Sequence, residues 1–115
     1  MSDDDTAIIR QANDDFRAGK PNIPGQWLMT QGIAGLIEET NKAPLDVLAI
    51  VQGFDQFSSD NDPYGAHDFG SFAFEGETCF WKIDLYDTDL RYGTPEPTDL
   101  SQTKRVLTIM LASEY

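Results

Sequence analysis

The residues of this chain that are best suited to chemistry lie together in one stretch, Asp60 to Gly70. This stretch holds three aspartates, the only histidine His67, the tyrosine Tyr64 and two glycines. Carboxylate oxygens bind hard metal ions, and an imidazole beside carboxylates is suited to proton transfer. The stretch therefore has to be weighed as a metal site, as an acid–base site and as a purely structural loop.

The spacing excludes a calcium-binding loop. Asp60, Asp62 and Gly65 match the start of such a loop. Its fifth position is however Tyr64, and the position that should hold a bidentate glutamate is Ser71. A magnesium or transition-metal site stays open by ligand type alone, with the ligands Asp60, Asp62, His67 and Asp68. We predict no metal and no other cofactor, because the chain has no second histidine and only one cysteine.

The same stretch also has the pattern of a rigid corner. Asp62-Pro63-Tyr64-Gly65 is typical of a type I turn, with Asp first, Pro second and Gly fourth. Asp60 and Asn61 can bond the backbone that follows them. A lone histidine beside carboxylates is usually a structural hydrogen-bonding residue, and only geometry can give it an acid–base role. The structural interpretation and an enzyme built on Asp60, His67 and Asp68 are both left open.

Two helices are predicted ahead of this stretch. The first begins after a cap at Ser2 or Asp3 and ends at Gly19. The second begins at Pro44, includes Gly53 and ends at Ser58. Residues 27–30 favour a short strand, whereas residues 32–42 are ambiguous. The apolar stripes are Ile8, Ile9, Ala12 and Phe16 in the first helix and Val47, Ile50, Val51 and Phe54 in the second.

Strands are predicted after the central stretch. Residues 69–74 and 78–86 favour a hairpin that turns at Glu75-Gly76, and residues 105–111 favour a last strand. Cys79 alternates with apolar residues, so we interpret it as a buried, inert thiol. The expected fold is α+β, with an antiparallel sheet of three to four strands packed against two helices, in a single globular domain over residues 1–115.

The charge of the chain restricts its partners. Twenty acidic and eight basic residues give a net charge of −12, and residues 46–99 hold twelve acids and two bases. Direct binding to nucleic acid or to an anionic membrane needs a basic surface, so neither is expected. No apolar run approaches the roughly 20 residues of a membrane-spanning helix. One cysteine cannot form a disulfide within the chain, which favours a reducing cytoplasm.

Several sequence motifs are long enough to be specific to a protein family. They are Phe54-Asp-x-Phe57, Asp60-Asn-Asp-Pro-Tyr-Gly-x-His-Asp-Phe-Gly, Phe80-Trp-Lys-Ile-Asp and Arg105-Val-Leu-Thr-Ile-Met-Leu-Ala. From about Met29 onward the chain resembles an uncharacterised bacterial family, the domain of unknown function 3768. The family pattern has a glutamate where this chain has Ala66, and Ser-Pro-Asp-Pro where residues 94–97 are Thr-Pro-Glu-Pro. The family has no established activity, so the resemblance implies no mechanism.

The first functional hypothesis is an acidic inhibitor that occupies a basic, nucleic-acid-binding surface of another protein, for example a CRISPR effector or a restriction enzyme. In size and charge alone the chain resembles small acidic anti-CRISPR inhibitors carried by phages and plasmids. Such a protein would act as a monomer or homodimer. The acids at the first helix start, Asp3 to Asp5, are expected to lie outside the contact surface. The predicted partner-binding residues are Asp60, Asp62, Tyr64, Asp68, Asp84, Tyr86, Asp87, Asp89 and Tyr92.

Two alternatives complete the sequence-based hypotheses. One is a small metal-assisted hydrolase or nuclease-like enzyme that uses the loop of Asp60, His67 and Asp68. The other is an acidic domain without a site, whose charge only keeps it soluble.

Overall fold

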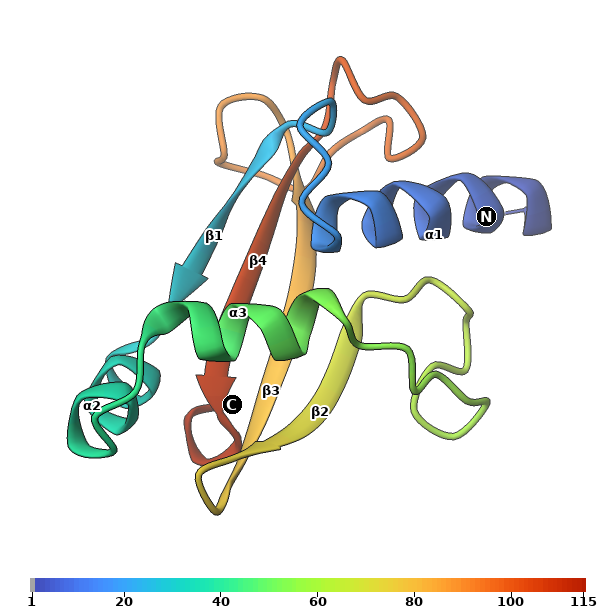
Figure 1. Cartoon of the computed structure of the whole chain (residues 1–115). Helices are drawn as coiled ribbons and strands as arrows, with labels where there is room; N and C mark the ends of the chain where they lie inside the picture. The colour runs from blue at the N-terminus through green and yellow to red at the C-terminus, as the bar shows by residue number, and fades with distance from the viewer. Residues whose placement is uncertain (1) are drawn as a thin grey trace.

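A computed structural model describes residues 2–115. Figure 1 shows how its elements follow one another. They are α1 (Asp3–Arg17), β1 (Gly25–Met29), α2 (Gln31–Glu39), α3 (Pro44–Gln52), β2 (Phe69–Phe74), β3 (Glu77–Tyr86), β4 (Lys104–Leu111) and the short 3₁₀ helix η1 (Ala112–Glu114).

The described strands form one four-stranded sheet in the order β1-β4-β3-β2. β2 pairs with β3 and β3 pairs with β4 in antiparallel fashion, whereas β1 runs parallel to β4. The α+β prediction is confirmed, and the sheet is mixed because of this one parallel pair. A parallel partner so distant in sequence leaves no local signal, since no short turn joins the two strands.

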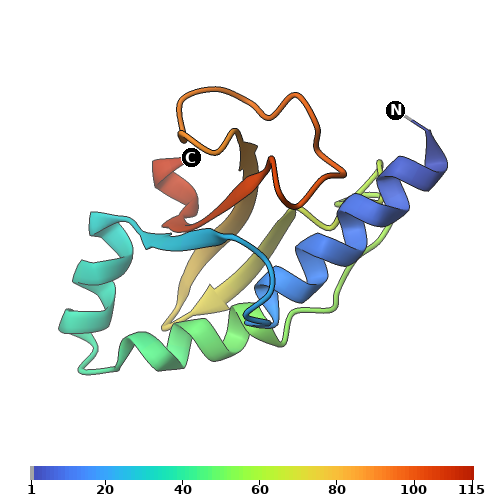
Figure 2. The ribbon, with the colours of Figure 1, turned by 90° about the horizontal axis from the view of Figure 1, so that it is seen from above.

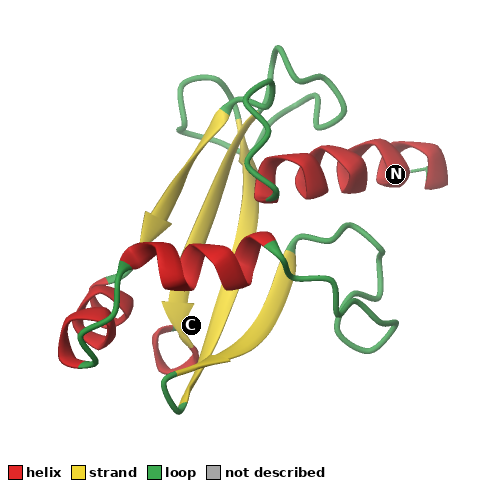
Figure 3. Ribbon diagram, viewed as in Figure 1, coloured by secondary structure: helices red, strands yellow, loops and turns green. Residues whose placement is uncertain are grey.

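The helices cover one face of the sheet. Figures 1 and 2 show α1 and α3 on the same side of the strands, with α2 beyond the β1 edge. Figure 3 separates these helices from the long loops that precede β2 and β4. α2 is the third α-helix and occupies the segment that the sequence left ambiguous. It begins because the side chain of Thr30 caps the N–H of Ile33 at 3.4 Å.

The first helix begins as predicted, since the side chain of Ser2 accepts a hydrogen bond from the N–H of Asp5 at 3.1 Å. Three of the four predicted apolar residues are buried, but Ile8 is 50% exposed. Two polar residues, Asn13 and Arg17, are buried on the same helix. The sheet-facing side of α1 is therefore partly polar, which the apolar spacing did not predict.

The third helix is shorter than predicted. It begins at Pro44 but ends at Gln52, and Gly53 is its C-cap rather than an interior residue. Ile50, which was predicted to lie on the buried stripe of this helix, is 37% exposed. Phe54 still reaches the core from the segment after the helix, where its ring packs edge-on against Trp81 at a centroid distance of 5.4 Å.

The hairpin is confirmed. Glu75 and Gly76 have φ angles of 51° and 81°, the left-handed pair that a two-residue turn between twisted strands requires. Cys79 and Trp81 are fully buried on the helix-covered face of β3. None of the helices formed by residues 2–115 is long and apolar enough to cross a membrane.

Candidate functional site

The central loop contains the predicted turn. The N–H of Gly65 donates to the C=O of Asp62 at 3.0 Å, and Gly65 has a φ of 70°. Just before the turn, the side chain of Asn61 accepts from the N–H of Ser58 at 2.8 Å and donates to the C=O of Gln56 at 2.9 Å. The loop is thus held by its own polar groups.

The loop is also bound to α1. Nη1 of Arg10 donates to the C=O of Gly65 at 3.0 Å, and Nδ2 of Asn13 donates to the C=O of Ala66 at 2.9 Å. These are long-range contacts between a helix and a segment more than fifty residues later. They explain why α1 carries polar residues on its sheet-facing side.

His67 lies at the centre of this contact, in the left-handed region with a φ of 54°. Its Nδ1 lies 2.8 Å from Oδ1 of Asp14, and its Nε2 lies 3.5 Å from Oδ2 of Asp62. The imidazole also stacks on the ring of Phe57, with centroids 3.7 Å apart. His67 is therefore enclosed by two carboxylates and one aromatic face.

Arg17 extends the cluster into the interior. Its guanidinium lies 3.2 Å from Oδ1 of Asp14 and donates to the C=O of Phe54 at 3.2 Å. The same group lies over the rings of Phe57 and Trp81, at 5.2 and 5.0 Å. Asp14 thus accepts hydrogen bonds from both His67 and Arg17. Sequence reasoning missed Asp14 and Arg17, although Asn13 and Arg17 continue the helical spacing of Ile9.

In this geometry the imidazole of His67 links the central loop to α1. The predicted acid–base group of Asp60, His67 and Asp68 is not assembled as such, because the carboxylates beside the imidazole are those of Asp14 and Asp62. Both ring nitrogens already face a carboxylate. Within residues 2–115, no group of three or more His, Cys, Asp or Glu side chains could hold a metal ion.

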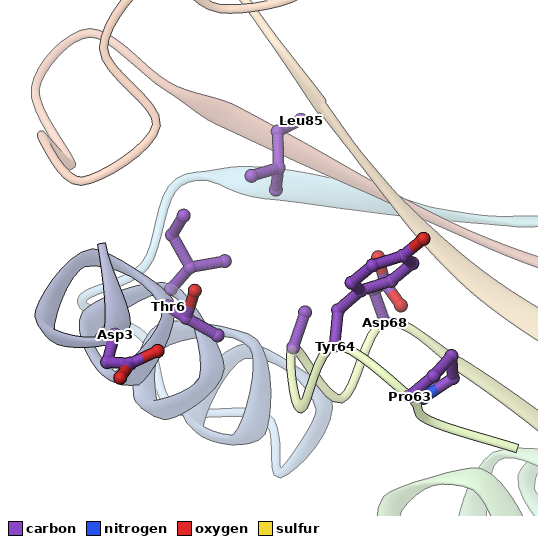
Figure 4. A pocket seen from close by; sticks show the side chains of 8 residues that line it. Asp3, Thr6, Pro63, Tyr64, Asp68 and Leu85 are labelled. Carbon is purple, nitrogen blue, oxygen red and sulfur yellow. The ribbon is translucent and has the colours of Figure 1, made fainter. Parts of the chain in front are cut away.

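A cleft of about 590 Å³ lies beside this cluster, between the first half of α1 and the central loop. Figure 4 shows Asp3 and Asp68 on its two sides. Asp3, which was expected to lie outside the contact surface, lines the same cleft as Asp68. The labelled lining residues are Asp3, Thr6, Pro63, Tyr64, Asp68 and Leu85.

Asp68 connects this cleft to the hairpin. Burial raises the pKa of its carboxyl group above the ordinary 3.8, and the charges of Asp62 and Asp84 raise it further. Asp84 projects from the face of β3 opposite to the helices, where it lies 3.0 Å from Nζ of Lys82. The acidic groups thus continue from the cleft to the open face of the sheet.

The predicted partner-binding residues fall into two groups. Those of the loop lie beside α1, but the side chain of Asp62 is only 6% exposed and offers little to a partner. The others lie in the last part of β3 or in the loop that follows it, where Asp87 accepts a hydrogen bond from the N–H of Arg91 at 3.0 Å. The tyrosines differ as well: Tyr64 and Tyr92 are 87% and 72% exposed, whereas Tyr86 is half-buried.

Arg105 is a buried cation that the sequence did not reveal. It is fully buried, and its Nε donates to Oδ1 of Asn13 at 2.7 Å. Its two terminal nitrogens have no hydrogen-bond partner among residues 2–115. Burial lowers the pKa of Arg105 to about 10. Its alternation with Leu107 and Ile109 was the available signal, because residues two apart in a strand share a face.

Comparison with known proteins places most of the chain in a family. A family model described as "Protein of unknown function (DUF3768)" matches residues 29–114. The chain belongs to this family. The DUF3768 match covers the central loop and the hairpin but leaves out α1, which supplies Asn13, Asp14 and Arg17 to the cluster. No match was found among curated proteins or among solved structures.

Proposed function

We propose that this DUF3768 protein is an acidic inhibitor that occupies a basic, nucleic-acid-binding surface of another protein. The observation that carries the proposal is the meeting of acids from distant segments around one cleft. Asp3 comes from α1 and Asp68 from the central loop, and Asp84 of β3 lies outside the cleft but near enough for its charge to raise the pKa of Asp68. They belong to a chain whose net charge is −12.

The placement of these acids shapes the electric field outside the protein. A cleft lined by one sign of charge, with walls of low dielectric, concentrates the potential outside it and speeds association with an oppositely charged partner. Duplex DNA presents about one charge per 1.7 Å of its axis. Carboxylates fixed on a helix, a loop and a strand can imitate a short part of that field without flexible tails.

Two exposed tyrosines supply the anchoring that charge alone does not. Tyr64 is 87% exposed and Tyr92 is 72% exposed. Tyrosines in the centre of protein interfaces often dominate the binding energy, whereas charged residues at the rim mainly raise the association rate. Each of these tyrosines has an aspartate within three residues of it in the chain. Suitable targets include CRISPR effectors and restriction enzymes, both of which hold DNA in basic channels.

The test measures binding to a panel of purified DNA-binding nucleases, among them a CRISPR effector and a restriction enzyme. The test variant is Asp3→Lys with Asp68→Lys, because both residues are exposed and both line the cleft. The matched control is Glu38→Lys with Glu39→Lys on α2, which changes the net charge by the same amount at exposed positions. Asp3 to Asp5 are unsuitable as controls, because Asp3 borders the cleft.

We expect the wild-type protein to bind a panel member, duplex DNA to compete, and affinity to fall steeply as salt rises. The test variant should bind at least about tenfold more weakly, which corresponds to roughly 1.4 kcal/mol, and the control should change little. Equal weakening in the two variants, or binding that ignores salt, would overturn the proposal. Failure to bind any member of the panel would count against these two classes of target.

A further inference from the structure

β2 is a free edge of the sheet. In the order β1-β4-β3-β2, its only neighbour among the described strands is β3. Figure 1 shows it as the outermost strand, on the side away from β1. The unpaired N–H and C=O groups of an edge strand form a template on which another chain can pair.

The register identifies the residues that present these groups. The N–H of Ile83 donates to the C=O of Asp68 at 2.8 Å, at the end of the ladder between β2 and β3. These two residues therefore belong to a hydrogen-bonded pair. Because such pairs alternate with non-hydrogen-bonded ones along antiparallel strands, Phe69, Ser71 and Ala73 turn their N–H and C=O groups away from β3.

This edge lacks the features by which sheets normally avoid pairing with other chains. Native edges carry charged side chains, proline or bulges. The sequence of β2 is Phe-Gly-Ser-Phe-Ala-Phe, which contains neither a charge nor a proline, and all six residues are in continuous register with β3. Ser71 and Ala73 are small and exposed. A second strand can approach them closely.

A groove of about 400 Å³ adjoins the edge. One wall is formed by residues 71–73 and the other by the end of α3 and residues 53–56. Ile50 gives this groove an apolar side chain that is 37% exposed. Asp55 gives it an exposed carboxylate, which forms no ion pair with any residue from 2 to 115.

We infer that the β2 edge and this groove receive an extended, positively charged segment of a partner protein, which adds a fifth strand to the sheet. The free backbone groups of residues 69, 71 and 73 would bind its main chain. Asp55 in the groove and Asp68 at the start of β2 would attract its basic side chains. The positive charge of the segment rests on the proposed function, whereas the strand pairing rests on the register alone.

Charge also disfavours a second copy as the occupant. Two chains of net charge −12 would meet at this edge, and each would bring its Asp55 and Asp68 toward the other. Like charges at a contact disfavour association, most strongly at low salt. A basic segment meets the opposite sign along the same groove.

The test uses a synthetic peptide of alternating lysine and valine with blocked ends, and amide hydrogen exchange measured by NMR. We expect the peptide to slow exchange at the amides of Phe69, Ser71 and Ala73. The same peptide with alternate backbone N-methylation, or with glutamate in place of lysine, should fail to do so. The substitution Ser71→Pro removes one outward N–H without touching the ladder with β3, whereas Ser71→Ala keeps it.

We expect Ser71→Pro to weaken peptide binding about tenfold, the loss of roughly one backbone hydrogen bond, and Ser71→Ala to leave it unchanged. If Ser71→Pro does not fold, Ser71→Lys serves instead, since a lysine at the edge should repel the peptide. Absence of protection, protection elsewhere, or equal binding by both variants would overturn the inference. Protection that grows with protein concentration without peptide would overturn it in favour of a second copy.

The proposed function and the added-strand inference can be rejected independently of each other. Peptide binding at β2 with no effect of DNA on any nuclease complex would retain the edge inference and reject nucleic-acid mimicry. Conversely, suppose that the protein binds a nuclease, that DNA competes for the complex, and that the amides of residues 69, 71 and 73 stay unprotected in it. That result would support nucleic-acid mimicry and reject the added strand.

Discussion

Gly70 shows how closely one residue is fitted to the core of this protein. A Cβ at this position would lie 2.6 Å from Cε2 of Trp81 and 2.8 Å from Cζ of Phe54. Both neighbours are large rings in the core, which cannot move aside cheaply. We predict that Gly70→Ala lowers the free energy of unfolding by about 1–3 kcal/mol, as overpacking typically does.

Urea unfolding of Gly70→Ala, compared with that of the control Gly35→Ala, checks this prediction. A Cβ at Gly35 would meet nothing within 4 Å, and Gly35 lies inside α2. The control should therefore raise the free energy of unfolding by about 0.5–1 kcal/mol, because alanine is the better helix former. Equal stability of Gly70→Ala and wild type would contradict the prediction, because it would show that the rings of Trp81 and Phe54 move aside at little cost.

Asp68 predicts a pH-dependent effect. Burial and two neighbouring carboxylates raise its pKa above 3.8, so the folded protein holds this proton more tightly than the unfolded chain does. Ionised Asp68 therefore destabilises the fold at neutral pH, and the penalty disappears as the pH falls through the raised pKa toward 3.8. We predict that Asp68→Asn raises the melting temperature at pH 7 and that the gain vanishes by about pH 4.

Asp99 provides a control of opposite sign. Hydrogen bonds from Ser101 and Gln102 lower the pKa of Asp99 below 3.8. Its stabilising effect is complete above 3.8 and is lost as the pH falls through the lowered value. Thermal scans across pH should therefore show Asp99→Asn losing stability at pH 7. A melting temperature for Asp68→Asn that stays below wild type at every pH would contradict the raised pKa of Asp68.

At the scale of elements, α1 is held by the central loop through polar contacts. Oδ1 of Asp14 accepts from both Arg17 and His67. Asp14→Ala leaves both donors without this partner, and we predict a loss of about 1–3 kcal/mol in the free energy of unfolding. Asp14→Asn keeps an acceptor oxygen and should lose clearly less. Denaturant unfolding at neutral pH compares them, and equal losses would show that the negative charge of Asp14, rather than its acceptor oxygen, stabilises these contacts.

The sequence was most informative where local rules decide the structure. The hairpin follows from Glu75-Gly76, because only residues that tolerate positive φ complete so tight a turn. The start of α1 follows from the cap at Ser2. The end of α3 was misplaced, because the apolar spacing continues through Phe54 although the chain leaves the helix at Gly53. Phe54 is buried by tertiary packing instead.

The candidate site could be predicted only in part, for the same physical reason. The turn at residues 62–65 is a local pattern, and it is present. The partners of His67 depend on where α1 packs, and Asp14 is 53 residues away in sequence. The parallel pairing of β1 with β4 and the burial of Arg105 are likewise results of long-range packing. Periodicity within one segment contains no information about such contacts.

For the whole molecule, the excess of acids over bases makes self-repulsion the dominant long-range electrostatic effect. Twenty acids face eight bases, and four of the six ion pairs among residues 2–115 involve side chains that are more than 20% exposed on both sides. Exposed pairs contribute little, and salt screens them together with the repulsion. Salt should therefore weaken the repulsion between the many unpaired carboxylates more than it weakens the attraction within the pairs.

We accordingly predict that the melting temperature rises with sodium chloride between about 10 and 200 mM, over which the screening length falls from about 30 Å to under 10 Å. The variant Glu38→Lys with Glu39→Lys carries less net charge and should show a shallower rise. Thermal unfolding by circular dichroism at several salt concentrations measures both slopes. A melting temperature that falls with salt would mean that attractive pairs, such as Asp14 with Arg17 and His67, outweigh the repulsion. The rise should also be smaller at pH 4, where carboxylates begin to lose their charge, because the repulsion that salt screens is then weaker.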